Sequence, residues 1–153
     1  MKLDIRAIGI VRGGRALPED DDWGASRCRL ELDATKFKPD ALSALDRFSH
    51  AEVLFVFDRV KDDEIVLGAR HPRGRKDWPL VGIFAQRGKN RPNRIGVCVC
   101  KIISVDGTAV EVEGLDAIDG TPIIDIKPVM REFLPRGEIR QPEWASELMK
   151  AYW

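Results

Sequence analysis

Ten residues between two apolar runs combine four cations with two amides, two glycines and a proline: Arg87-Gly88-Lys89-Asn90-Arg91-Pro92-Asn93-Arg94-Ile95-Gly96. Guanidinium and ammonium groups bind phosphate and carboxylate oxygens, and binding residues concentrate in loops of this kind. We call residues 87–94 the cationic ledge and expect it to hold an acidic ligand.

The cationic ledge is part of a longer basic segment. Residues 70–94 contain eight cations and one acid, Asp77, so the segment carries a charge of about +7 in a chain whose formal net charge is +0. Such a local field attracts phosphates even when the whole protein is neutral. Pairing of these cations with acids elsewhere in the chain is the alternative. The acidic run Glu19–Asp22 is predicted to be a solvated loop, with the ordering of ligand groups as a second interpretation.

A second candidate site is a turn with two carboxylates, Asp116 and Asp119, followed by Gly120-Thr121-Pro122. An Asp side chain on a tight turn can accept hydrogen bonds from backbone amides, which explains one of the two as purely structural. Asp125 and Lys127 alternate with isoleucines and so share one face of the next short strand. We expect a polar pocket at the end of that strand.

Histidine and cysteine are the remaining candidates for chemistry. His50 precedes the apolar run Val53–Phe57, where a lone histidine is either a hydrogen-bonded structural residue or a base. Cys98 and Cys100 are two apart on one predicted strand, which is a poor geometry for a mutual disulfide. We expect these two residues and Cys28 to be reduced, packed thiols. Metal ligation is the alternative, and we predict no structural metal.

The elements that position these residues are short runs, apolar or alternating apolar and polar, bounded by turn residues, which is the pattern of β-strands. The predicted strands are residues 3–11, 27–33, 51–58, 64–68, 80–85, 95–105, 109–115 and 123–126. Asp106-Gly107 predicts a hairpin between two of them, because both residues tolerate positive φ. Helices are predicted to begin at Pro39 and Pro142, where good helix formers follow, and to pack on the sheet.

Many short strands with few helices predict a mainly β fold, a closed or nearly closed single-sheeted barrel without exposed edges. With 153 residues the chain fits one domain, residues 1–153. In the run 95–105, valines face one way and cysteines the other, so both faces look buried, and a helix or a partner subunit must cover the outer one. We expect a homodimer.

Sequence signals for membranes and for common cofactor folds are absent. No run approaches the roughly 20 apolar residues that span a bilayer, and Asp4 and Arg6 interrupt the apolar start of the chain, unlike a signal peptide. We therefore expect a cytoplasmic protein with no membrane partner. Neither a Gly-x-Gly-x-x-Gly after a strand, nor Gly-x-x-x-x-Gly-Lys-Ser/Thr, nor the helix signature of metalloproteases occurs, so these nucleotide and protease motifs are excluded.

Three blocks of the chain resemble one known family. They are Phe48-Ser49-His50, the stretch from Gly82-Ile83-Phe84-Ala85-Gln86-Arg87 to Arg91-Pro92-Asn93-Arg94-Ile95-Gly96, and the stretch from Leu115-Asp116 through Asp119-Gly120-Thr121-Pro122 to Asp125-Ile126-Lys127-Pro128. In this order and spacing they look like the TsaA or YaeB-like family, also called tRNA methyltransferase O. The resemblance covers roughly residues 4–130.

The resemblance implies an S-adenosyl-L-methionine-dependent methyltransferase on a single-sheeted β-barrel without a Rossmann domain. It also implies a homodimer with cofactor sites near the subunit interface, and methylation of N6 of N6-threonylcarbamoyladenosine at position 37 of certain tRNAs. By motif position, the cofactor contacts would come from Asp58, Arg59, Arg87, Val97, Asp116, Ala117, Ile118 and Asp119, with a further contribution from the loop at Trp23-Gly24.

The resemblance also suggests roles for single residues. Asp116 or Asp119 could accept hydrogen bonds from ribose hydroxyls or the cofactor ammonium, and Arg87 could bind the cofactor carboxylate. Because the methylated nitrogen carries a hydrogen, a base is expected, and Asp119 and His50 are the candidates. The residues that would contact RNA phosphates or the threonyl carboxylate are Lys89, Arg91, Asn93 and Arg94.

The chain departs from the family pattern at several positions. It has Gly88-Lys89 where Ser-Pro is usual, Arg94 where a second proline is usual, and Val129 where tyrosine is usual. We also expect no second, C-terminal domain of the kind found in the longer bacterial members. Three functions stay open: an RNA methyltransferase, a methyltransferase of a small acidic metabolite, and a noncatalytic barrel that binds S-adenosyl-L-methionine or RNA.

Overall fold

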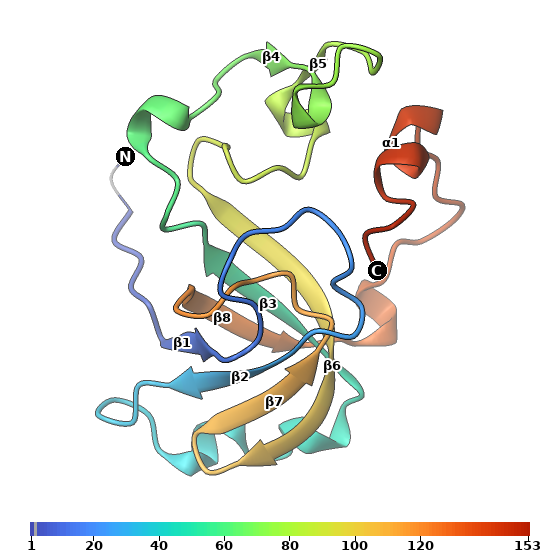
Figure 1. Cartoon of the computed structure of the whole chain (residues 1–153). Coiled ribbons are helices and arrows are strands. Elements are labelled where there is room, and N and C mark those ends of the chain that lie inside the picture. Colours follow the sequence, from blue (N-terminus) through green and yellow to red (C-terminus); the bar gives the residue numbers. More distant parts are fainter. Residues whose placement is uncertain (2) are drawn as a thin grey trace.

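The computed structural model describes Met1 and residues 3–153. Its strands are β1 (Gly9–Arg12), β2 (Arg27–Leu32), β3 (His50–Val56), β4 (Ala69–Arg70), β5 (Val81–Gly82), β6 (Ile95–Asp106), β7 (Ala109–Glu113) and β8 (Pro122–Pro128). Six of them form a closed antiparallel barrel in the order β1-β2-β7-β6-β3-β8, while β4 and β5 pair separately (Figure 1). The predicted mainly β, single-sheeted barrel is confirmed.

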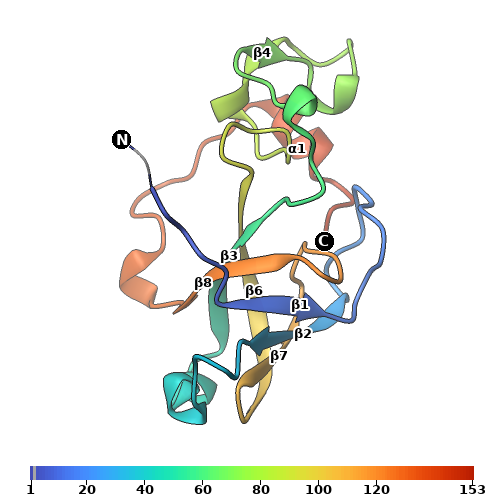
Figure 2. The ribbon, with the colours of Figure 1, turned by 90° about the vertical axis from the view of Figure 1, so that its left-hand side faces the viewer.

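The helices are short. They are the 3-10 helices η1 (Pro39–Leu42), η2 (Leu45–Arg47), η3 (Asp62–Glu64), η4 (Pro72–Gly74), η5 (Ile83–Ala85) and η6 (Arg131–Phe133), and the α-helix α1 (Glu143–Leu148). Figures 1 and 2 show β4 and α1 beyond one end of the barrel, and the β6–β7 turn with η1 and η2 at the other end. Among the described residues, no helix has the length and apolar character needed to cross a membrane.

The barrel interior is filled by side chains from alternate strand positions. The inward-facing residues of two strands show the pattern: Cys28, Leu30 and Leu32 in β2, and Ala51, Val53 and Phe55 in β3. Period-two alternation places each set on one face of its strand. Because full burial of a Leu, Val or Phe side chain stabilises a protein by about 1.5–3 kcal/mol, these inward rows are a main source of the barrel's stability.

The two faces of β6 have different environments. Cys98 and Cys100 point into the barrel and are buried, whereas Val99 on the outer face is 47% exposed. In the single chain the barrel covers only the inner face, and burial of the outer face by a partner subunit stays a prediction.

All three cysteines are free and buried, so the predicted reduced, packed thiols are confirmed. Burial raises the pKa of the Cys28 and Cys100 thiols from 9.0 to about 12. Among Met1 and residues 3–153, no three or more His, Cys, Asp or Glu side chains form a group that could hold a metal ion.

These thiols predict a stability change at alkaline pH. The free energy of unfolding should fall as the pH rises from about 9 to about 12, because thiols in the unfolded chain ionise near pH 9 while Cys28 and Cys100 in the folded chain stay protonated up to about pH 12. Urea unfolding at a series of pH values measures the slope. The double variant Cys28→Ala/Cys100→Ala should show a shallower slope, and an unchanged slope would contradict the explanation.

The predicted β6–β7 hairpin is confirmed, with its loop one residue later than expected. Asp106 pairs with Ala109, so the two loop residues are Gly107 and Thr108. Gly107 has a φ of +58°, a conformation that residues with a Cβ rarely adopt. A two-residue loop with Gly first matches the right-handed twist of the paired strands.

Three predicted strands differ from those observed. β1 begins at Gly9 and not at residue 3, and no strand covers residues 64–68. There the Lys61 amide donates to the Glu64 carboxylate at 2.8 Å, which closes a local turn before β4 begins. Of residues 80–85 only Val81–Gly82 form a strand, because the Gln86 amide bonds back to the Ile83 carbonyl at 3.2 Å and η5 forms. Local turns form at residues 64–68 and 80–85 because, in the described part of the chain, no strand of the barrel pairs with these residues.

One of the two predicted helices is confirmed. α1 forms where expected, but the segment after Pro39 forms two 3-10 turns interrupted at Ala44, which has a φ of +66°. Leu42 of η1 is buried in the barrel core. No residue of α1 belongs to that core among the described residues, so the prediction that both helices pack on the sheet is wrong for α1.

Candidate active site

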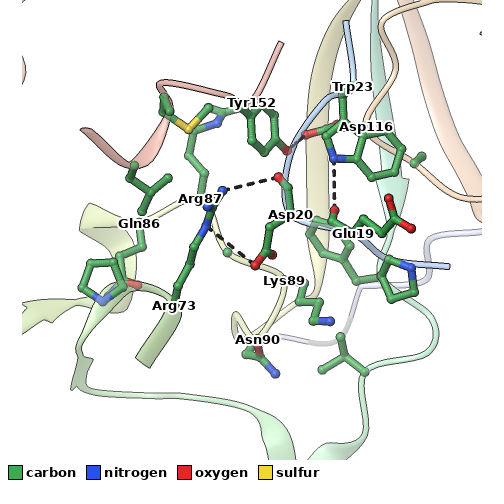
Figure 3. A pocket seen from close by; sticks show the side chains of 18 of the residues that line it. Glu19, Asp20, Trp23, Arg73, Gln86, Arg87, Lys89, Asn90, Asp116 and Tyr152 are labelled. Carbon is green, nitrogen blue, oxygen red and sulfur yellow. Dashed lines mark hydrogen bonds and ion pairs between the residues drawn. The ribbon is translucent and has the colours of Figure 1, made fainter. Parts of the chain in front are cut away.

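A cavity of about 860 Å³ opens at the end of the barrel where the long connections gather. Small-molecule sites typically measure about 300–1,000 Å³. Six segments supply most of its lining: residues 18–23, the end of β3 and the loop after it (residues 55–60), residues 70–74, residues 85–90, residues 116–118, and residues 141–152 (Figure 3). All of these segments except the last contain residues that the sequence singled out.

The floor of the cavity is aromatic. Phe55 and Phe57 meet edge to face with ring centroids 5.3 Å apart, and Phe55 is 1% exposed. A Cβ at position 96 would lie 2.4 Å from the Phe55 ring, so only glycine leaves room for the ring there. This close approach explains the glycine at the end of the Ile95-Gly96 motif.

Asp116 faces the cavity. Its Oδ2 accepts a hydrogen bond from the hydroxyl of Tyr152, and Figure 3 shows the two side chains next to each other. Its Oδ1 is buried and has no hydrogen-bond partner among the residues that the structure describes. A buried carboxylate oxygen without a donor is costly, so Asp116, which lines the cavity, retains an unused acceptor. The Cys98 thiol nearby has a raised pKa, mainly because it is buried and partly because of the Asp116 charge.

Asp119 has a structural position instead. Its Oδ1 accepts the Gly13 amide at 2.8 Å, its own amide donates to the Arg15 carbonyl at 2.8 Å, and its carbonyl accepts from Arg59 at 3.2 Å. These bonds hold the loop after β1 against the turn, and Asp119 does not line the cavity. The two aspartates that look equivalent in the sequence therefore differ, because only Asp116 lines the cavity.

The other predicted cofactor residues lie in or beside the cavity. Asp58, Arg59, Ala117 and Ile118 line it, and so does Arg87. Val97 does not, but its carbonyl accepts a hydrogen bond from Arg87 Nη2 at 2.7 Å, so the backbone of β6 orients this guanidinium. Trp23, from the loop that the sequence indicated only weakly, also lines the cavity and is 3% exposed.

Two arginines of the cationic ledge bond to groups within the protein. Arg91 donates to the Gln86 carbonyl at 3.0 Å, and Arg94 forms an ion pair with Asp62. Lys89 is exposed, lines the cavity, and makes no ion pair within the described part of the chain. Asn93 is exposed but, like Arg91 and Arg94, lies outside the cavity lining. Lys89 and Arg87 are thus the ledge cations that reach the site.

Three acids of the acidic run, Glu19, Asp20 and Asp22, are exposed in a loop, as predicted, while Asp21 is half-buried. Asp21 forms an ion pair with Arg73 at 2.8 Å, and Glu19 and Asp20 line the cavity. Arg15 donates to the Asp21 carbonyl and stacks over the Trp23 ring at 4.3 Å. Asp21 and Arg73 are 52 residues apart, so no local pattern could have predicted this pair.

Three of the eight basic-segment cations therefore pair with acids, namely Arg73 with Asp21, Arg75 with Asp77 and Arg94 with Asp62. The alternative of internal charge pairing holds for these three. The positive charge that remains is concentrated in fewer residues than the sequence suggested, and Lys89 and Arg87 bring part of it to the cavity.

His50 is not brought to the cavity. It is exposed at the start of β3, while Phe55 and Phe57 reach the cavity at the other end of the strand, and its Nδ1 lies 2.7 Å from the Ser49 hydroxyl. Asp125 and Lys127 pair with each other on one face of β8, as their alternation predicted, but they also lie outside the lining. The polar pocket is therefore built at Asp116 and not along β8.

One wall of the cavity was not predicted from the sequence. Its residues come from α1 and the segments around it: Gln141, Pro142, Trp144, Ala145, Leu148, Met149 and Tyr152. The four-residue spacing of Trp144 with Leu148 and of Ala145 with Met149 was the available signal, but it says only that the helix has an apolar face, not what that face covers.

Comparison with known proteins gives a consistent set of relatives. Residues 15–133 match the model of the tRNA-methyltransferase O N-terminal domain. The chain is 32% identical over 132 residues to a "Probable S-adenosyl-L-methionine-binding protein" of Archaeoglobus fulgidus, covering 84% of this chain and 34% of the relative. It is 35% identical over 102 residues to the human "tRNA (adenine(37)-N6)-methyltransferase", covering 67% of this chain and 23% of that protein. The chain thus spans about a third or less of these two relatives.

A shorter relative and a solved structure extend the comparison. An archaeal "Probable S-adenosyl-L-methionine-binding protein" of Methanothermobacter thermautotrophicus is 32% identical over 130 residues, which cover 84% of this chain and 90% of that protein. The crystal structure of TrmO from Pseudomonas aeruginosa superposes with a TM-score of 0.75 at 26% identity, over 94% of this chain and 62% of that one.

Proposed function

This chain belongs to the tRNA-methyltransferase O N-terminal domain family, and from that premise we propose that it is an S-adenosyl-L-methionine-dependent methyltransferase that acts on tRNA. The names of the human and archaeal relatives support both parts of the proposal. The observation that carries it is the cavity with the buried, unpartnered Oδ1 of Asp116 above an aromatic floor.

The cavity fits the proposed cofactor in size and in chemistry. S-adenosyl-L-methionine bound there would supply an electrophilic methyl group. Asp116 Oδ1 would accept a hydrogen bond from a ribose hydroxyl or the ammonium group, and Arg87 would bind the carboxylate. Phe55 and Phe57, with Ala117 and Ile118, offer apolar surface and exclude water from the reacting atoms. Asp58 and Arg59 are exposed at the cavity and are proposed as further polar contacts.

Methyl transfer from a sulfonium is an in-line displacement: the bond from carbon to sulfur breaks as the bond from carbon to the acceptor nitrogen forms, and that nitrogen loses its proton. The protein's main contribution is then alignment of the two reactants in a dry site. Asp119 and His50 are not given the base role, because the Asp119 carboxylate holds Gly13 and His50 lies at the far end of β3.

We propose N6 of N6-threonylcarbamoyladenosine 37 as the methylated atom, because the human relative is a tRNA (adenine(37)-N6)-methyltransferase. Lys89 at the cavity, with Arg91, Asn93 and Arg94 on the same loop, would contact phosphates or the threonyl carboxylate. We also propose a homodimer in the cytoplasm. The exposed apolar side chains Val99 and Phe133 are available for such an interface.

The experiment that tests the proposed function uses S-adenosyl-L-methionine labelled in its methyl group and tRNA from cells that lack this modification. We expect label in the tRNA fraction and, after digestion, in methylated N6-threonylcarbamoyladenosine. Label in another nucleoside would show that a different atom is methylated, but the protein would still be a tRNA methyltransferase. Label only in small acidic molecules would overturn the tRNA assignment, and no transfer to either pool would overturn the enzymatic one.

Lys89→Ala should weaken tRNA binding and lower the slope of log K against log salt by about one, because one phosphate contact is lost. Filter binding at several salt concentrations measures this slope. Lys101→Ala is the matched control: Lys101 is an exposed lysine of β6 that pairs with His50, away from the cavity. Equal slopes for the two variants would contradict a role for Lys89 in RNA binding.

A further inference from the structure

The wall formed by residues 141–152 lies outside the part of the chain that matches the family model, which ends at residue 133. It nevertheless supplies a hydrogen bond to the carboxylate of Asp116. The Tyr152 hydroxyl donates to Oδ2, and Oδ1 of the same carboxylate is left buried without a partner among the described residues. One oxygen of Asp116 is thus bonded within the protein, and the other keeps its capacity to accept a hydrogen bond.

Backbone bonds hold Tyr152 in place. The Trp23 amide donates to the Tyr152 carbonyl at 2.8 Å, and the Asp22 amide donates to the Ala151 carbonyl at 2.9 Å. Gly24 permits this pairing, because a Cβ there would lie 2.8 Å from the carbonyl carbon of Trp153. The loop that contributes Trp23 to the cavity is therefore also the support for the tyrosine.

A second contact holds the same wall on its other side. The indole nitrogen of Trp78 donates to Glu147 Oε2 at 2.8 Å, and Trp78 is only 6% exposed. Glu147 belongs to α1, so this hydrogen bond joins the helix to the connection between β4 and β5. With the bonds at Trp23, this contact fixes the wall from both ends.

We propose that Tyr152 is a positioning residue of the cofactor site: its hydroxyl fixes Asp116 through Oδ2 so that Oδ1 is presented to a hydrogen-bond donor of the bound ligand. This inference rests on the proposed function, since it takes the ligand to be S-adenosyl-L-methionine. It assigns part of that site to a segment beyond the family match.

The protonation state of Tyr152 suits this role. Burial, and then the charge and hydrogen bond of Asp116, raise the pKa of the phenol well above its usual value of 10.0, so the hydroxyl keeps its proton and donates at any physiological pH. The nearby Arg87 acts in the opposite direction but less strongly. An isosteric ring without the hydroxyl, as in Tyr152→Phe, would retain the packing and remove only the donor.

Calorimetric titration with S-adenosyl-L-methionine tests the proposal. Tyr152→Phe should bind roughly five- to tenfold more weakly than the unaltered chain. The variant loses a hydrogen bond to the charged Asp116 carboxylate, and this loss affects the ligand only through Asp116. In an Asp116→Asn background, Tyr152→Phe should cause no further loss, because its effect acts through that carboxylate. Ser146→Ala removes a hydroxyl from the same wall, outside the cavity lining, and should bind like the unaltered chain.

A second measurement needs no ligand. Tyr152 is the sole tyrosine in the sequence, so the alkaline absorbance change of tyrosinate reports this residue alone. Asp116→Asn should lower the pKa of the phenol, because the charge that raises it is gone. An unchanged titration would show that the two side chains are not bonded and would overturn the proposal.

The outcomes separate the two hypotheses. If the unaltered chain binds S-adenosyl-L-methionine and Tyr152→Phe binds equally well, or if the losses from Tyr152→Phe and Asp116→Asn simply add, the positioning role is wrong while the proposed function stands. If the unaltered, folded chain does not bind at all, the proposed function fails and the inference fails with it.

Discussion

Asp116→Asn is expected to weaken S-adenosyl-L-methionine binding by about 10- to 100-fold, since a hydrogen bond to a charged group contributes about 1.5–3 kcal/mol and about 1.4 kcal/mol corresponds to a factor of ten. The oxygen concerned is buried and lacks a partner in the described residues, so a ligand donor there would form a strong, dry, charge-assisted bond. Asparagine keeps the size of the side chain and removes the charge. Calorimetric titration of both proteins measures the difference.

The matched control for this variant is Asp106→Asn. Asp106 is exposed at the end of β6 beside the hairpin turn, at the opposite end of the barrel from the cavity. It should bind S-adenosyl-L-methionine as tightly as the unaltered chain. If Asp116→Asn also binds within about twofold of the unaltered chain, Asp116 Oδ1 is not a ligand contact and the site must be sought elsewhere.

Phe55→Ala is expected to lower the free energy of unfolding by about 3–5 kcal/mol, the usual effect of removing a buried aromatic ring. Phe55 is 1% exposed, meets Phe57 edge to face, and fills the space left by Gly96. The cavity left behind would lie under the proposed cofactor, so binding should fall as well. Urea unfolding followed by tryptophan fluorescence gives the stability change.

Phe84→Ala provides the comparison, because Phe84 is 78% exposed and its loss should change stability by no more than about 0.5 kcal/mol. Phe55→Leu serves if Phe55→Ala does not fold, because it keeps most of the apolar volume and should cost less than the alanine variant. Equal stability of Phe55→Ala and Phe84→Ala would contradict the description of the barrel core.

The barrel could be predicted because its strands have a simple periodic pattern. Short apolar or alternating runs identified the strands β2 and β3, and the Gly-containing turn before β7 identified the hairpin. The strand predicted at residues 64–68 is not observed, because the apolar residues of this run do not face a core, and Leu67 is 79% exposed. Whether a short apolar run becomes a strand depends on a neighbouring strand that can pair with it, which local sequence does not encode.

The site could be predicted only in part. The motif positions indicated Asp116 and Arg87, and both line the cavity. Sequence alone could not separate Asp116 from Asp119, because the difference lies in contacts with Tyr152 and Gly13, residues 36 and 106 positions away. The wall from α1 was not predicted for the same reason. The sequence of an amphipathic helix shows that one face is apolar, but not which part of the protein that face contacts.

Arg94 shows how a departure from the family pattern changes local structure. Its φ is +52°, and its amide donates to the Arg91 carbonyl at 3.0 Å, which closes the turn of the cationic ledge. Proline, usual at this position in the family, can adopt neither this φ nor this hydrogen bond. The ledge of this chain therefore has its own backbone geometry, with the Arg94 side chain directed to Asp62.

A crystal structure of the protein grown with S-adenosyl-L-methionine tests the central claim most directly. We expect ligand density in the cavity above Phe55, with a ligand donor within hydrogen-bond distance of Asp116 Oδ1, the Tyr152 hydroxyl still on Oδ2, and the ligand carboxylate near Arg87. Density for the ligand at another place on the barrel, or an empty cavity at a ligand concentration that saturates the protein in solution, would contradict it.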